Sequence, residues 1–229
     1  MALETAAVIP ARDEAATLAD TLRALHTIPN LSHLIVADDG SRDTTPDIAL
    51  ALGAELVHAS PPGKPAGKGH ALRHGLIRVC PHPPDAVLLL DADLGYSAAL
   101  LATLIAALDE DIPVSIAAFP PAATKGGFGL VKRFARSAIT SRTGYVPSEP
   151  LSGQRALLAP VLDILPGIAP GFGAEVGMTL DLLAAGIKPL EIPLSLTHRP
   201  TGRNLRGFAH RARQGLDVVH ALRGARIPW

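Results

Sequence analysis

The feature that most constrains the fold is an alternation of short apolar runs with segments of helical periodicity along the first half of the chain. Short apolar runs predict buried strands, and apolar side chains three or four residues apart predict helices. The predicted strands are residues 6–9 (ending at Pro10), 34–37, 55–58, 86–90 and 114–119, and the predicted helices are about 14–25, 44–53, 70–79 and 98–108. This order is typical of an α/β fold in which helices flank a mostly parallel sheet.

The second half of the chain is less regular, but it contains no recognisable linker or repeat. The predicted elements there are a loop at 126–129, helices at 130–142, 174–185 and 207–222, a short strand after the loop 143–153, and a strand at 190–196. A length of 229 residues suits one α/β core. We therefore predict a single domain that spans residues 1–229.

The charge of the chain is balanced overall but uneven along its length. The formal net charge is zero, which argues against a protein built to bind nucleic acid. From Arg199 to the C-terminus there are seven arginines and one acidic residue, Asp217. This basic segment fits a phosphate-bearing ligand, an anionic membrane surface or a solvated helix. The apolar stripe Leu216, Val219 and Leu222 fits either a homodimer contact or a core-facing side of the last helix.

Cysteine content and hydropathy bear on the compartment. The single cysteine, Cys80, cannot form an internal disulfide, and no Cys/His cluster has the spacing of a zinc site. Glu4 interrupts the N-terminus, so the segment does not resemble a signal peptide. Asp91 and Asp93 divide the most apolar stretch into pieces too short to span a bilayer. We expect a cytoplasmic protein whose contact with a membrane, where there is one, is peripheral.

Asp91-Ala92-Asp93 follows directly after a strand that is apolar on both faces. Carboxylates two residues apart at the exit of a buried strand can both approach a hard divalent cation such as Mg²⁺ or Mn²⁺. Such a cation commonly bridges a diphosphate. The alternative is a loop with two solvated acidic side chains.

A second acidic turn, Asp38-Asp39-Gly40-Ser41, follows the second predicted strand. A carboxylate here can accept hydrogen bonds from a nucleotide base or from ribose hydroxyls. The same residues also suit a tight turn that leads into a capped helix. The segment from Pro10 to Glu14 joins the first strand to its helix and is uninformative alone.

Taken in order, four motifs resemble glycosyltransferase family 2: Pro10-Ala-Arg-Asp-Glu14, Asp38-Asp-Gly-Ser41, Gly67-Lys-Gly69 and Leu90-Asp-Ala-Asp-Leu94. The resemblance implies a GT-A fold, with a nucleoside-diphosphate sugar bound by residues 1–95 and an acceptor bound by 96–229. The implied donor-binding residues are Pro10, Ala11, Arg12, Glu14, Asp38, Asp39, Lys68, Asp91 and Ala92. Asp93 is implied as a metal ligand that takes part in catalysis. One departure is Asp13, where many members carry Asn.

The second half resembles the glucosyl-3-phosphoglycerate synthases through Pro150-Leu-Ser-Gly153, Gly171-Phe-Gly-Ala-Glu-Val-Gly177 and His198-Arg199. Polyprenyl-phosphate sugar transferases share a looser version of this layout. The resemblance implies that His198 completes the metal shell and that Glu175 faces the sugar or the acceptor as a catalytic residue. A surface histidine and an acidic residue that interacts with a helix dipole are the alternatives.

The similarity to the synthases fails at several acceptor positions. After Gly126-Gly127 the chain has Phe128, Gly129 and Leu130 in place of polar and basic residues, and Pro200 stands where the synthases have Asn. The candidate acceptor-binding residues are Lys125, Gly126, Gly153, Arg155, Arg199 and Arg203. The acceptor therefore stays open, with 3-phosphoglycerate as one candidate, and so does the stereochemical outcome.

We conclude that the sequence predicts a metal-dependent hexosyltransferase. A polyprenyl phosphate is the alternative acceptor, because the basic C-terminal helix suits a membrane surface. A sugar-phosphate nucleotidyltransferase is a second alternative, but Pro10–Glu14 lacks the glycines of the loop expected there. A nucleotide-sugar binder without catalysis is a third, and the retained acidic residues argue against it.

Overall fold

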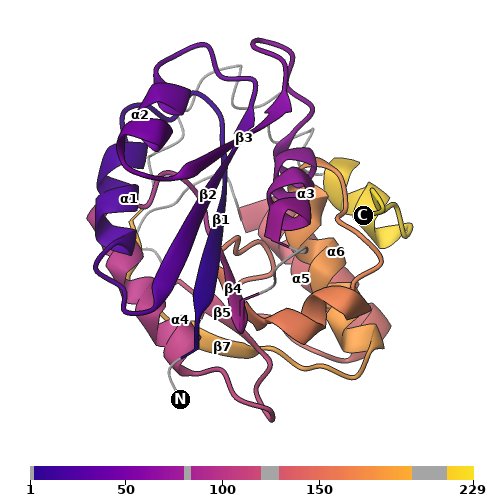
Figure 1. The fold of residues 1–229 in the computed structure, drawn as a ribbon. Helices are drawn as coiled ribbons and strands as arrows, with labels where there is room; N and C mark the ends of the chain where they lie inside the picture. Colours follow the sequence, from indigo (N-terminus) through magenta and orange to yellow (C-terminus); the bar gives the residue numbers. More distant parts are fainter. Residues whose placement is uncertain (1–2, 80–83, 120–128, 198–215) are drawn as a thin grey trace.

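The computed structural model describes residues 3–79, 84–119, 129–197 and 216–229 of the chain. In these ranges a seven-stranded sheet has the order β3-β2-β1-β4-β6-β5-β7 (Figure 1). The strands are β1 (Thr5–Ala11), β2 (Leu31–Asp39), β3 (Glu55–Ser60), β4 (Ala86–Leu89), β5 (Val114–Ala118), β6 (Arg155–Leu158) and β7 (Leu190–Pro193). β6 runs antiparallel to both of its neighbours, β4 and β5, and the other pairs are parallel.

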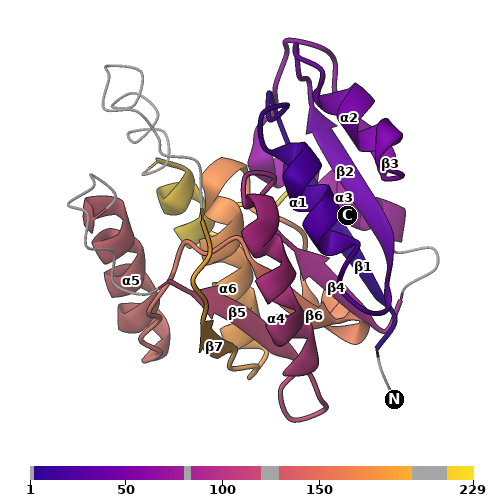
Figure 2. The same cartoon turned by 90° about the vertical axis from the view of Figure 1, so that its left-hand side faces the viewer.

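Helices cover both faces of the sheet (Figures 1 and 2). The helices are α1 (Leu18–Leu25), α2 (Thr45–Ala51), α3 (Lys68–Val79), α4 (Ala102–Ala106), α5 (Gly129–Thr143) and α6 (Ala174–Ala184), with 3₁₀ turns η1 (Gly95–Leu101), η2 (Ala159–Ile164) and η3 (Gly171–Gly173). Alternate residues of β1 point to opposite faces. Ile9 packs with α1, α2 and α4, whereas Val8 packs with α3 and α6. The predicted α/β fold with a mostly parallel sheet is confirmed.

Several element ends differ from those predicted. β1 runs through Pro10 to Ala11. It pairs with β4 only as far as Val8, so the missing N–H of Pro10 costs no hydrogen bond of that ladder. The segment predicted as a helix from 98 begins as the 3₁₀ turn η1, and β7 ends at Pro193 rather than continuing to 196.

The C-terminal segment is fastened to α6. Residues 216–222 are helical and bury Val218 and Ala221, while Leu216 of the predicted apolar stripe is 60% exposed. Arg226 forms a two-pronged ion pair with Asp181, at 2.6 and 2.7 Å. Residues 207–215 of the predicted last helix lie outside the described residues. At least one arginine of the basic segment is therefore a structural residue rather than a ligand.

We expect Arg226→Ala to lower the free energy of unfolding by about 2 kcal/mol, because it leaves the largely buried Asp181 carboxylate without its cation. Urea denaturation measures this change. Arg223→Ala is the matched control, since Arg223 is exposed on the same segment, and its effect should stay within about 0.5 kcal/mol. Equal effects of the two substitutions would contradict the structural role of Arg226.

Candidate donor site at the carboxyl ends of the strands

Three predicted motifs meet at one edge of the sheet. β1 lies between β2 and β4 and is parallel to both, with Ala11 opposite Asp38 and Val8 opposite Leu89. The segments that follow these three strands therefore emerge side by side, where ligands bind in open α/β sheets. The antiparallel β6 begins at the same edge, because Arg155 pairs with Leu89. This pairing brings the second half of the chain to the predicted donor site.

Lys68 is the centre of the contacts at this edge. Its ammonium lies 2.5 Å from Asp91 Oδ1 and 2.6 Å from Glu175 Oε1. Burial works to lower the pKa of Lys68, but the charges and hydrogen bonds of the two carboxylates outweigh it and raise the pKa above its usual value. An ammonium has three N–H donors, and these contacts use two of them. Lys68 thus stays charged and links the start of α3, the end of β4 and the start of α6.

Gln154 is a site residue that sequence reasoning missed. Its side-chain amide donates to Asp91 Oδ2 at 2.7 Å, so each oxygen of Asp91 has its own donor. Gln154 directly follows the Ser-Gly pair of the Pro150–Gly153 motif. This position next to a family motif is the sequence feature that could have identified Gln154 as a site residue. Its role becomes visible only when β6 is paired with β4. The Asp91 carboxylate is therefore held in a fixed orientation.

Gly153 packs against the same group of charges. A Cβ atom added to Gly153 would lie 2.6 Å from Lys68 Nζ and 3.0 Å from Asp91 Oδ1. The glycine thus allows the backbone to approach the ion pair, which any side chain would displace. Its predicted contact with the acceptor stays a prediction.

Thr21 of α1 holds the loop that carries Asp93. The Thr21 hydroxyl donates to the carbonyl of Ala92 at 2.9 Å and accepts the N–H of Gly95 at 2.9 Å. Thr197, the last described residue before His198, donates its hydroxyl to the Leu94 carbonyl at 3.0 Å. The chain that leads into the His198-Arg199 motif therefore lies against the loop of Asp93.

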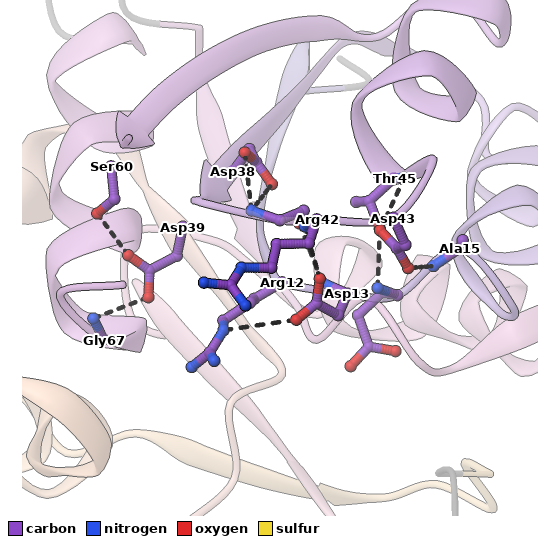
Figure 3. Close-up of polar contacts among 12 residues, drawn as sticks. Arg12, Asp13, Ala15, Asp38, Asp39, Arg42, Asp43, Thr45, Ser60 and Gly67 are labelled. Carbon is purple, nitrogen blue, oxygen red and sulfur yellow. Dashed lines mark hydrogen bonds and ion pairs between the residues drawn. The ribbon is translucent and has the colours of Figure 1, made fainter. Parts of the chain in front are cut away.

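The loops after β1 and β2 are hydrogen-bonded to each other (Figure 3). Asp13 adopts a left-handed conformation with φ of 54°, which Asn and Asp tolerate better than most residues. Its N–H donates to the Ser41 hydroxyl at 3.0 Å, and its carboxylate accepts the N–H of Arg42 at 2.8 Å. An Asn side chain could make the same contacts, which explains why Asp13 is compatible with the family pattern. Arg12, next to Asp13 in the same loop, is exposed.

The two carboxylates of the acidic turn are buried and hydrogen-bonded within the protein (Figure 3). Asp39 accepts the Ser60 hydroxyl at 2.6 Å and the N–H groups of Ala66 and Gly67 at 2.8 Å each. Asp38 accepts the N–H of Ser41. Asp39 therefore fixes the loop that leads directly into Lys68. Contact of either carboxylate with a nucleoside stays a prediction.

Asp43 adds a further hydrogen bond between the loops after β1 and β2, and another at the start of α2. Its burial works to raise its pKa, but hydrogen bonds from Thr45 and from the N–H of Ala15 outweigh that effect and hold the pKa below its usual value. Asp43 thus ties the turn before α2 to the loop before α1.

Glu175 and Arg155 form the floor of the site. Glu175 lies in the first turn of α6 and is 5% exposed, and Arg155 is 1% exposed. Arg155 donates to the Ser152 carbonyl and to the Thr179 hydroxyl, at 3.0 Å each. Burial lowers the pKa of Arg155 to about 10, although the charges of Glu175, Tyr145 and Glu191 work in the opposite direction. This burial argues against the predicted contact of Arg155 with an acceptor.

The metal and acceptor residues are only partly described. His198, Arg199, Arg203, Lys125 and Gly126 lie outside the described residues, and their roles stay predictions. Within the described ranges no three His, Cys, Asp or Glu side chains are grouped as a metal site. The carboxylate of Asp93 offers the hard oxygen that Mg²⁺ and Mn²⁺ accept, and its role as a metal ligand stays a prediction.

The α/β fold, with its acidic motifs at the carboxyl ends of the strands, has the architecture of a nucleotide-sugar transferase. Comparison with known proteins identifies the family. Residues 6–149 match the family model of glycosyl transferase family 2. The chain therefore belongs to glycosyl transferase family 2, and the resemblance drawn from the motifs is confirmed.

Relatives in this family include glucosyl-3-phosphoglycerate synthase of Mycobacterium tuberculosis (strain CDC 1551 / Oshkosh), 32% identical over 197 residues that cover 76% of this chain and 59% of the relative. Glycosyltransferase AglJ of Haloferax volcanii is 29% identical, over 84% of this chain and 63% of that protein. The chain thus spans about three fifths of the length of these curated relatives.

Solved structures of the M. tuberculosis synthase have a similar fold. Its complex with Mn²⁺, uridine diphosphate and glucosyl-3-phosphoglycerate has a TM-score of 0.76 and 26% identity, covering 98% of this chain and 81% of that one. Its complex with Mg²⁺ and uridine diphosphate has a TM-score of 0.77 and 27% identity over the same shares. The GT-A fold expected from the motifs is confirmed.

We expect Gly153→Ala to lower the free energy of unfolding by about 1–3 kcal/mol, because the added methyl group displaces the Lys68 ammonium from Asp91. Gly129→Ala is the control, since a Cβ there meets open space at the start of α5. Urea denaturation of both variants measures the effect. A Gly153→Ala protein as stable as the wild type would show that the close approach to Lys68 is not required.

Proposed function

We propose that the protein transfers a hexosyl group from a nucleoside-diphosphate sugar to the hydroxyl of a small phosphorylated acid, with Mg²⁺ or Mn²⁺. The observation that carries this proposal is the Lys68 ammonium, held by Asp91 and Glu175 at the edge where the family motifs meet. The similarity to synthases solved with uridine diphosphate-glucose and phosphoglyceric acid supports uridine diphosphate-glucose as the donor and 3-phosphoglycerate as the first acceptor to try.

The chemistry of sugar transfer matches the charges at this edge. The bond between the sugar C1 and the diphosphate oxygen breaks, and negative charge grows on the departing nucleoside diphosphate. The remaining N–H of Lys68 and the N-terminus of α3 both favour that charge. A divalent cation held by Asp93 and His198 would supply further stabilisation of the leaving diphosphate.

Glu175 is the residue that we assign to the acceptor side. Its carboxylate lies 2.6 Å from the Lys68 ammonium, so donor and acceptor groups are coupled through one ion pair. In the proposed reaction it accepts a hydrogen bond from a sugar hydroxyl, or the proton that the acceptor hydroxyl loses as it bonds to C1. The family assignment favours this transfer over the nucleotidyltransferase alternative.

We expect the protein to form a glucosylated phosphoglycerate from uridine diphosphate-glucose, 3-phosphoglycerate and Mn²⁺, and chelation of the metal to abolish the product. Mass spectrometry of the product measures transfer. Asp93→Asn should lower the rate at least about 100-fold, because it removes a metal ligand. Asp47→Asn, an exposed change on α2, is the control and should leave the rate unchanged. Full activity of Asp93→Asn would exclude the proposed metal site.

A lipid-linked phosphate is the second candidate acceptor, and the surface of α5 favours it. Leu130 and Phe134 lie one turn apart on this helix and are 77% and 45% exposed. The helix carries four basic residues and no acidic one. It lies at the outer edge of the molecule, beyond α6 (Figure 2). An apolar strip among cations suits the surface of an anionic bilayer. Among the described residues, no helix has the length and apolarity to cross a membrane.

If the acceptor is lipid-linked, the protein should sediment with vesicles that contain phosphatidylserine but not with phosphatidylcholine alone. The double variant Leu130→Ser/Phe134→Ser should then lose most of this binding. Leu50→Ser, which changes an equally apolar and exposed residue on α2, should keep it. Absence of the wild-type protein from both pellets would eliminate this acceptor class and leave the small phosphorylated acid.

A further inference from the structure

We propose that Arg155 is a positioning residue whose buried guanidinium, through Thr179, holds the first turn of α6 and with it Glu175 in place beneath the candidate donor site. The predicted role of Arg155 in binding the acceptor is replaced by this one. The catalytic consequence of the proposal rests on the proposed function, whereas the coupling between the two side chains does not.

The surroundings of Arg155 in the described residues argue against direct contact with an acceptor. The side chain is 1% exposed, and its Nη2 atom is buried with no hydrogen-bond partner in the described part of the chain. The cavity that it lines, together with Lys68 and Glu175, has a volume of about 10 Å³. This is about the space that one water molecule needs, roughly 10–15 Å³, and it is smaller than a phosphate group.

The geometry connects Arg155 to Glu175 in two ways. Arg155 Nη1 donates to the Thr179 hydroxyl, which donates in turn to the backbone carbonyl of Glu175 at 2.9 Å. The charge of Glu175 also acts directly on the guanidinium. The hydrogen-bond path fixes the first turn of α6, and the charge of the guanidinium attracts the carboxylate that this turn carries.

Charge balance explains why a buried arginine is placed here. The floor of the site contains two carboxylates, Asp91 and Glu175, and two cations, Lys68 and Arg155. Without Arg155, Lys68 alone would have to balance both carboxylates, of which Glu175 is buried and Asp91 is partly exposed. An uncompensated buried charge is costly, so the Glu175 carboxylate would move from its present position. With Arg155 present, Lys68 can direct its third N–H to a ligand while both carboxylates stay in place.

A double-mutant cycle on thermal stability tests the coupling without any assay of activity. Arg155→Met keeps the length of the side chain and removes its charge, and we expect it to lower the melting temperature by roughly 5–10 °C. In the Glu175→Gln background, Arg155→Met should lower the melting temperature by less than half as much, because the negative charge that Arg155 compensates is absent. Additive effects of the two substitutions on the melting temperature would show that Arg155 stabilises the protein only through its contacts with Ser152 and Thr179. That result would overturn the proposal.

Arg136→Met is the matched control. Arg136 on α5 likewise has a buried side-chain nitrogen, Nε, without a partner in the described residues, and it donates to the Ser148 carbonyl. Its substitution should show no coupling to Glu175→Gln. Coupling of the same size at Arg136 would mean that the cycle reports a general loss of stability, and would likewise overturn the proposal.

Transfer kinetics provide the second readout. Arg155→Met should lower kcat at least about 10-fold and change the KM for the donor less than about threefold, and Arg155→Lys should recover most of kcat. Unchanged kcat in Arg155→Met, or no recovery with lysine in a folded protein, would contradict a positioning role. If the wild-type protein transfers no sugar, the proposed function fails, while the stability cycle still decides whether Arg155 and Glu175 are coupled.

Discussion

The ion pair of Lys68 with Asp91 and Glu175 is the interaction on which the arrangement of the site depends. It joins residues from α3, the loop after β4, and α6, and therefore joins the regular first half of the chain to the less regular second half. A buried ion pair contributes little net stability, but a broken one leaves a charge uncompensated. The pair therefore specifies how the two halves meet. Gly153, Gln154 and Arg155 surround it because β6 enters the sheet beside β4.

The surrounding structure supports this ion pair from two directions. On the side of the candidate donor site, Asp39 fixes the loop that ends at Gly67. The backbone from which the Lys68 side chain extends is therefore held in place. On the opposite side, Arg155 lies beneath Glu175 in a region closed to solvent. In the proposed reaction, preorganised charge of this kind would stabilise the leaving diphosphate without reorganisation of the site.

Much of the fold could be predicted from the sequence, because the apolar runs and the acidic motifs after them mark parallel strands whose ends meet. The same logic predicted a helix at about 70–79, directly after the Gly67-Lys68-Gly69 motif, and α3 begins two residues earlier, at Lys68. It could not predict that Gln154 orients Asp91 across 63 residues of sequence, because this contact depends on the antiparallel pairing of β6. Nor could it predict the burial of Arg155, since a motif does not show which side of a strand a side chain occupies.

The most direct test of this arrangement is a crystal structure of the protein with uridine diphosphate and Mn²⁺. We expect the metal on Asp93 and a diphosphate oxygen within hydrogen-bond distance of the Lys68 ammonium, with the contacts to Asp91 and Glu175 retained. A nucleotide bound away from the carboxyl ends of β1, β2 and β4, or a Lys68 side chain that leaves both carboxylates, would contradict the central role of this ion pair.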